Sequence, residues 1–205
     1  MNNPWEEIDL KDYEAHMSLE NVFQLQAMNR MMKAQFYAHR ADSLMILGVA
    51  GGNGLEHIRK GDFKAVYGAD INPHYLDACQ KRYPELEGTL HPLCVDLLSD
   101  ALQLPHADLI VANLLVEYIG YDCFQRVVTL IDPQYVSCVI QINTEDAFVS
   151  ESPYLHVFDR LDEIHHQMEA AALTAAMKAI GYTQALTDEM PLPNGKKLVR
   201  IDFLK

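Results

Sequence analysis

Four glycines lie within the seven residues from Gly48 to Gly54, whose sequence is GVAGGNG. The apolar residues 44–47 precede them and are typical of a strand buried on both faces. Glycines at such a place let the backbone turn tightly and approach a ligand, and a helix predicted from Asn53 would add free N–H groups. The spacing fits neither the nicotinamide fingerprint nor a phosphate-binding P-loop. The segment therefore indicates another kind of ligand loop, with an ordinary tight turn as the alternative.

Two acidic residues end predicted strands and could bind a nucleoside. Asp70 closes the segment 65–70, 22 residues after Gly48, where a carboxylate can accept hydrogen bonds from both hydroxyls of a ribose. Asp96 closes the weaker segment 89–96, where it could accept a hydrogen bond from an adenine amino group. An exposed strand end or a helix cap is the alternative for Asp70, and a loop that continues to Ser99 and Asp100 is the alternative for Asp96. With the glycine-rich loop, the two carboxylates predict a nucleoside-containing ligand.

The elements that must position these residues alternate between strand and helix. The predicted strands are 44–49, 65–70, 89–96, 108–113, 136–143, 182–190 and 197–203, and the predicted helices among them are 53–60, 72–83, 121–130 and 161–180. An Asn-Gly pair at 194–195 predicts a hairpin between the last two strands. Such alternation predicts an α/β protein with a doubly wound, largely parallel sheet and helices on both faces, whose ligands bind at the carboxyl ends of the strands.

The first 42 residues are different, because they predict only helices. Apolar residues recur at helical spacing over 19–40, with Ser18 as the expected cap, and a shorter helix is expected over 5–17. We expect residues 1–42 to form a helical cap or lid on a single compact domain, 43–205. The side chains expected to face the site are Tyr13, His16 and Met17. A surface helix packed on the sheet edge is the alternative.

Four segments in this order resemble the motifs of the class I S-adenosylmethionine-dependent methyltransferases of the small-molecule type. They are LMILGVAGGNG from residue 44, VYGADIN from 66, CVDL from 94 and DLIVANLL from 108. The resemblance implies a Rossmann-like seven-stranded sheet in the order 3-2-1-4-5-7-6 and S-adenosylmethionine as cofactor. The cofactor-binding residues that it implies are Gly48, Ala50, Gly52, Asn53, Asp70, Ile71, Asn72, Asp96, Leu97 and Asn113, with Tyr13 and Met17 from the lid.

Two positions depart from the pattern of that family. An acid that normally helps to place the methionine amino group is replaced by Ile46, and the middle glycine of the first motif is replaced by Ala50. The amino group then needs another partner, either Asn113 or a residue of the N-terminal helices. These departures favour a rival hypothesis, a non-catalytic nucleoside-binding or interaction protein that kept the fold. Asp70 and Asn113 favour the enzyme.

The residues after Asn113 bear on the substrate. They lack the prolines of the Asn-Pro-Pro-Tyr type of motif found in adenine and glutamine N-methyltransferases, so the resemblance implies a small-molecule methyl acceptor. In-line methyl transfer needs alignment more than acid–base groups. The candidate catalytic residues are Glu117, which could orient or deprotonate a nucleophile, Tyr118, which could line the pocket, and His16.

Composition limits the partners. Sixteen basic and 29 acidic residues give a net charge of −13, which argues against a nucleic-acid partner. No apolar run is long enough for a membrane span, and the start does not resemble a signal peptide, so we expect a cytoplasmic protein with four reduced cysteines. Asp162, His166 and Glu169 share a helical face, but a solvated polar surface explains them better than a metal site. A homodimer stays open.

Overall fold

The computed structural model describes residues 3–143 and 148–205 and contains one seven-stranded sheet. The strands are β1 Ser43–Leu47, β2 Ala65–Asp70, β3 Leu90–Cys94, β4 Leu109–Asn113, β5 Tyr135–Ile142, β6 Thr183–Pro191 and β7 Lys197–Leu204. Their order is β3-β2-β1-β4-β5-β7-β6, as predicted. The first five pair in parallel, and β7 pairs antiparallel with both β5 and β6.

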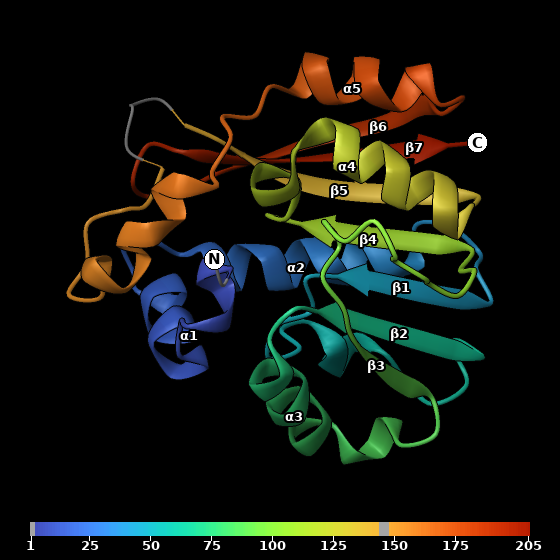
Figure 1. Cartoon of the computed structure of the whole chain (residues 1–205), viewed down its shortest axis with the longest axis horizontal. Coiled ribbons are helices and arrows are strands. Elements are labelled where there is room, and N and C mark those ends of the chain that lie inside the picture. Colours follow the sequence, from blue (N-terminus) through green and yellow to red (C-terminus); the bar gives the residue numbers. More distant parts are fainter. Residues whose placement is uncertain (1–2, 144–147) are drawn as a thin grey trace.

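Helices cover both faces of this sheet (Figure 1). The α-helices are α1 Leu10–Ser18, α2 Gln24–Tyr37, α3 Pro73–Arg82, α4 Val116–Ile131 and α5 Ala170–Ala179. The 3-10 helices are η1 Pro4–Glu6, η2 Leu55–His57, η3 Pro84–Leu86 and η4 Leu155–Glu163. Helices α4 and α5 lie on one face of the sheet, and α2 and η2 lie on the other. No helix in the described ranges is both long and apolar enough to cross a membrane.

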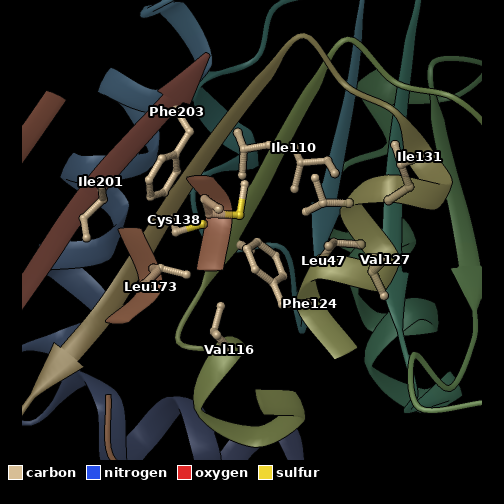
Figure 2. Packing of buried hydrophobic residues seen from close by; sticks show 14 of the residues in the cluster. Leu47, Ile110, Val116, Phe124, Val127, Ile131, Cys138, Leu173, Ile201 and Phe203 are labelled. Atoms are coloured by element: carbon tan, nitrogen blue, oxygen red, sulfur yellow. The ribbon is translucent and has the colours of Figure 1, made fainter. Parts of the chain in front are cut away.

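Alternate residues of the central strands enter two separate cores, as the pleat requires. Met45 and Leu47 pack beneath α4 and α5, whereas Leu44 and Ile46 pack with Phe36 of α2. Figure 2 shows the first core, in which Phe124, Cys138, Leu173 and Ile201 lie among other buried side chains. Helix α2 is therefore part of the sheet's own core, although it belongs to the N-terminal segment.

Two predicted helices in the first half of the chain were wrong in extent. Residues 53–60 form only the short η2, because Gly52 and Gly54 take left-handed φ values of 85° and 91°. Thus, no regular helix follows the glycine-rich loop. The helix predicted over 19–40 begins at Gln24, since Phe23 is left-handed, with a φ of 56°. Ser18 ends α1 and does not cap α2.

Two predicted helices in the second half also differ. The helix expected from Leu161 begins only at Ala170, because η4 occupies residues 155–163. Helix α4 begins at Val116, five residues before the predicted start, and is broken by Gly120, whose φ of 72° and ψ of 167° are not helical. The break lets the first turn of α4 point away from the rest of the helix. Glu117 and Tyr118 therefore belong to a separate turn at the end of β4.

The segments η1, α1 and η4 gather beyond the carboxyl ends of the parallel strands (Figure 1). Hydrogen bonds attach the N-terminal segment to α3. Asn72 Nδ2 donates to the Trp5 carbonyl at 3.0 Å, and the Tyr75 hydroxyl donates to the Ile8 carbonyl at 2.8 Å. These contacts hold η1 and α1 across the edge where ligands bind in doubly wound sheets.

Candidate functional site

A cavity opens at the carboxyl ends of β1, β2 and β4. Together with its open mouth, it encloses about 730 Å³ of space, open solvent included. We call it the main cavity. Its lining includes nine of the predicted site residues, namely Tyr13, Gly48, Ala50, Asp70, Ile71, Asp96, Leu97, Asn113 and Tyr118. Sheet topology therefore brings together residues from Gly48 to Tyr118, and α1 adds Tyr13 to them.

Asp70 forms the floor of the main cavity at the end of β2. Its Oδ2 accepts a hydrogen bond of 2.9 Å from the Ala50 N–H, and its Oδ1 accepts one of 2.9 Å from the Asn72 N–H. Burial raises the pKa of the carboxyl, while these backbone donors act in the opposite direction. Each carboxylate oxygen has a second lone pair, so the fixed carboxylate can still accept from a ligand.

The glycine-rich loop is left-handed at its alanine as well as at three of its glycines. Ala50 takes a left-handed φ of 46°, between Gly48 at 72° and Gly52 at 85°. The N–H groups of Gly48 and Val49 donate to the Ala69 carbonyl at 2.8 and 3.1 Å, which ties the loop to β2. Ala50 therefore occupies a backbone conformation that favours glycine.

Asn113, at the end of β4, is oriented by a helix that the sequence did not connect with the site. Gln35 of α2 donates to Asn113 Oδ1 at 2.9 Å and accepts from Asn113 Nδ2 at 2.9 Å. Gln35 is fully buried and also donates to Ser137 Oγ at 2.9 Å. Ser137 in turn contacts Asp202, which is paired with the buried Arg200. A polar network thus fixes the Asn113 side chain from behind the sheet.

The far end of the main cavity is formed after β3. Asp96 Oδ1 accepts a hydrogen bond of 2.9 Å from the Leu98 N–H, and the Asp96 side chain is exposed. Leu97 is nearly buried beside it. An apolar wall next to an acidic acceptor is the arrangement that the sequence predicted for a base-binding end.

A second cavity, the inner pocket, shares four lining residues with the main cavity. These are Trp5, Tyr13, Leu114 and Tyr118. The Trp5 ring meets the Tyr13 ring edge-on at 5.7 Å and the Tyr118 ring at 5.0 Å. The three aromatic rings therefore form the boundary between the two cavities.

Glu117 lies in the inner pocket with only 3% of its surface exposed. Its Oε1 accepts a hydrogen bond of 2.8 Å from the Gln141 N–H, whereas Oε2 has no hydrogen-bond partner among the described residues. Burial raises the pKa of Glu117 to about 7. An acid of this kind can hold or release a proton near neutral pH.

Two histidines line the inner pocket beside Glu117. His16 Nδ1 lies 2.7 Å from Ser152 Oγ, and the His165 ring stacks on Phe148 at 3.7 Å. Burial lowers the pKa of both histidines to about 4. Both rings are therefore neutral near pH 7.

A third, smaller cavity lies between the glycine-rich loop and the N-terminal helices. Glu14 of α1 lines it together with Gly48, Ala50 and Asn113. Arg82 of α3 donates to Glu14 at 2.6 and 3.0 Å and to the Gly51 carbonyl at 2.9 Å. Helix α1 therefore brings a carboxylate to the loop beside Ile46, where the family pattern has an acid on the strand.

Not every predicted site residue lines the main cavity. His16 and Met17 line the inner pocket, and Asn53 lines the third cavity. Gly52 and Asn72 line none of the three cavities; Asn72 caps α3 and binds Trp5. Three side chains that the sequence analysis did not select belong to the site or support it: Trp5, Glu14 and Gln35. The lone tryptophan was the only one of these with a visible signal. In residues 3–143 and 148–205, no group of three metal-ligating side chains is found.

Comparison with known proteins identifies the fold but gives no relative by sequence. No protein-family model matches the chain, and no curated protein matches it either. Among solved structures, the N-methyltransferase NodS from Bradyrhizobium japonicum WM9 with S-adenosyl-L-homocysteine has a TM-score of 0.69 at 12% identity, over 100% of this chain and 99% of that one.

Two other similar structures differ in activity. Magnesium protoporphyrin IX methyltransferase from Synechocystis PCC 6803, with bound SAH, has a TM-score of 0.61 at 12% identity, over 95% of this chain and 86% of that one. The [4+2]-cyclase SpnF has a TM-score of 0.65 at 11% identity, over 88% and 82%. A shared fold can therefore accompany different reactions. The strand order and the similarity to these solved structures show that the chain has the Rossmann-like fold of the class I methyltransferases.

Proposed function

We propose that this protein is an S-adenosylmethionine-dependent methyltransferase that acts on a small-molecule acceptor. The observation that carries the proposal is Asp70, whose two carboxylate oxygens are held by backbone N–H groups at the end of β2 and face the main cavity. Similar structures that contain SAH or belong to methyltransferases support the same choice of cofactor.

The cavities provide a place for each part of the cofactor. Asp70 accepts from the ribose hydroxyls, and Asp96 with Leu97 receives the adenine. The methionine end lies along Gly48 and Ala50 toward the third cavity, where the Glu14 carboxylate takes over the role of the missing strand acid. The inner pocket then holds the methyl acceptor.

The residues of this chain align the reactants and exclude water. When bound, S-adenosylmethionine supplies a methyl group on a sulfonium, which is a good electrophile without further activation. The rings of Trp5, Tyr13 and Tyr118 lie between the two cavities and shield the point of transfer from solvent. Segments η1 and α1 act as the lid that carries two of these rings.

Calorimetric titration with S-adenosylhomocysteine tests the cofactor assignment. Asp70→Asn should weaken binding by roughly 1.5–3 kcal/mol, the scale of hydrogen bonds to charged groups. Asp77→Asn, on the exposed side of α3, is the matched control and should bind like the wild type. Unchanged affinity in a folded Asp70 variant would remove the ribose assignment. Binding without turnover on any acceptor would favour the non-catalytic alternative.

We also infer that nucleic acid is not a substrate, since the net charge of −13 opposes a phosphate backbone. A gel-shift assay at low salt with single- and double-stranded probes should show no complex. Binding that falls steeply with salt would contradict this inference. A cytoplasmic location stays a prediction of the sequence, and a homodimer stays open.

A further inference from the structure

The inner pocket contains one unsatisfied carboxylate oxygen. Glu117 is buried, and its Oε1 is fixed by the Gln141 N–H at 2.8 Å, so that the side chain is held in one orientation. Glu117 lines this pocket, and its buried Oε2 has no hydrogen-bond partner among the described residues. A buried acceptor without a donor is costly, so its retention indicates a donor that arrives from outside.

The side chains around Glu117 indicate which kind of hydrogen-bond donor fits the inner pocket. The lining of the inner pocket in the described ranges is mostly aromatic and aliphatic and contains neither lysine nor arginine. Lys196 is not among the lining residues and donates to the Phe148 carbonyl at 2.6 Å. Besides burial, its charge helps to lower the pKa of His16 and His165. Since both histidines are neutral near pH 7, Glu117 is the one lining group of the described ranges that ionises there.

We propose, building on the methyl transfer proposed above, that the inner pocket takes an amine attached to an apolar or aromatic body and that Oε2 of Glu117 accepts its N–H. The protonated amine first passes one proton to the Glu117 carboxylate, which frees the nitrogen lone pair. On transfer, a nitrogen–carbon bond forms while the carbon–sulfur bond breaks and leaves its electron pair on sulfur. The atoms and charges balance: the products are the N-methylammonium ion, S-adenosylhomocysteine and a protonated Glu117.

Other acceptors match this pocket less well. A carboxylate would bring a second negative charge against Glu117 in a site with little water, which both anions disfavour. An alcohol offers a single O–H and no positive charge. A protonated amine gives a charge-assisted hydrogen bond and ionises Glu117 on arrival, while its apolar part contacts rings such as Tyr118 and Phe148.

Three probes that share the 2-phenylethyl body test the proposal: 2-phenylethylamine, 2-phenylethanol and 3-phenylpropanoate. Each is titrated calorimetrically into the intact protein saturated with S-adenosylhomocysteine. We expect the amine to bind at least about tenfold more tightly than the carboxylate, in line with a hydrogen bond to a charged group. Glu117→Gln should abolish that preference, whereas Glu20→Gln, at an exposed position, should keep it.

An infrared measurement covers the case in which Glu117→Gln folds poorly. At pH 6 Glu117 is mainly protonated, so addition of the amine to the wild-type complex should remove one protonated-carboxyl band. Failure of S-adenosylhomocysteine to bind would overturn the proposed function itself. If that ligand binds but the amine does not at millimolar concentration, or binds no better than the carboxylate, the amine proposal alone is wrong.

Discussion

Gln35 and Asn113 exchange two side-chain hydrogen bonds of 2.9 Å each. Gln35 belongs to α2, and Asn113 ends β4 in the lining of the main cavity. A residue of the N-terminal segment therefore sets the orientation of a site residue on the sheet. Because Gln35 is fully buried and also donates to Ser137, it has no freedom to adopt another position.

Gln35→Met keeps the shape of the side chain but removes its hydrogen bonds. It should lower the free energy of unfolding by about 1–3 kcal/mol, since the buried Ser137 hydroxyl and the half-buried Asn113 amide each lose a partner. It should also weaken the binding of S-adenosylhomocysteine, because the Asn113 side chain is no longer fixed. Denaturant unfolding and calorimetry measure the two effects. Lys33→Ala on the exposed face of α2 is the control, and equal behaviour of the two variants would contradict the positioning role.

The sheet could be predicted because its strands have a local signal. Apolar runs such as residues 44–47 are buried on both faces, and Asn194-Gly195 marks the hairpin. Helix extent was predicted less well, since it depended on single backbone conformations. Phe23 takes a positive φ inside a pattern that otherwise has helical spacing, and nothing in the periodicity distinguishes it from continuing helix. Gly120 lay outside the predicted helix 121–130, and the turn of α4 that precedes it was missed.

The site could be predicted only where strand ends define it. Asp70 follows a clear strand and lies where expected. Glu14 and Gln35 reach the site through contacts with residues 68 and 78 positions away, and such pairs leave no trace in a single sequence. Glu117 was selected for its place after Asn113, but its unpaired oxygen is visible only in the structure.

Two glycines with similar backbone angles provide a matched test of loop packing. A Cβ at Gly52, whose φ is 85°, would lie 2.7 Å from the Tyr83 ring and 2.8 Å from Cys79 Sγ. At Gly61, whose φ is 97°, nothing lies within 4 Å. Gly61→Ala should therefore cost only the backbone strain, about 1–2 kcal/mol. Gly52→Ala should lower the free energy of unfolding clearly more than this, as measured by denaturant unfolding. Equal losses in the two variants would show that the glycine-rich loop is loosely packed.

Glu14 should matter for the methionine end of the cofactor. Glu14→Gln removes the carboxylate from the third cavity, and we expect S-adenosylhomocysteine to bind about tenfold more weakly. Glu7→Gln is a matched control, because Glu7 is also ion-paired to an arginine, Arg160 at 2.5 Å, but lines none of the three cavities. If both variants lose the same affinity in calorimetry, Glu14 acts only by attaching α1 to Arg82.

The raised pKa of Glu117 makes stability depend on pH. Between pH 4.5 and about 7 the folded protein keeps a proton on Glu117 that the unfolded chain has lost. The free energy of unfolding therefore falls as pH rises through this range. Glu117→Gln does not titrate there, so its stability relative to the wild type should grow by about 3 kcal/mol from pH 4.5 to 7. His16 and His165 titrate in both proteins, so their effect cancels in the comparison. A constant difference would contradict the raised pKa.

The lid formed by η1 and α1 should be needed for ligand binding but not for folding of the sheet. Deletion of residues 1–17 should leave the sheet folded, since its first strand begins at Ser43 and α2 is retained. The deletion should weaken the binding of S-adenosylhomocysteine, because Trp5 and Tyr13 no longer cover the main cavity. It should abolish methyl transfer, because water then enters the site. Calorimetry and circular dichroism on the shortened chain measure both outcomes.

Trp5 gives an independent check on the intact chain, because it is the single tryptophan of the sequence and lines both the main cavity and the inner pocket. Binding of S-adenosylhomocysteine should change its fluorescence, and hydrogen exchange in α1 should slow when the ligand is added. Trp5→Phe should lose the fluorescence change while it keeps most of the affinity, since an aromatic ring is retained. If exchange is unaltered and the shortened chain binds normally, η1 and α1 are packing elements and the lid assignment is wrong.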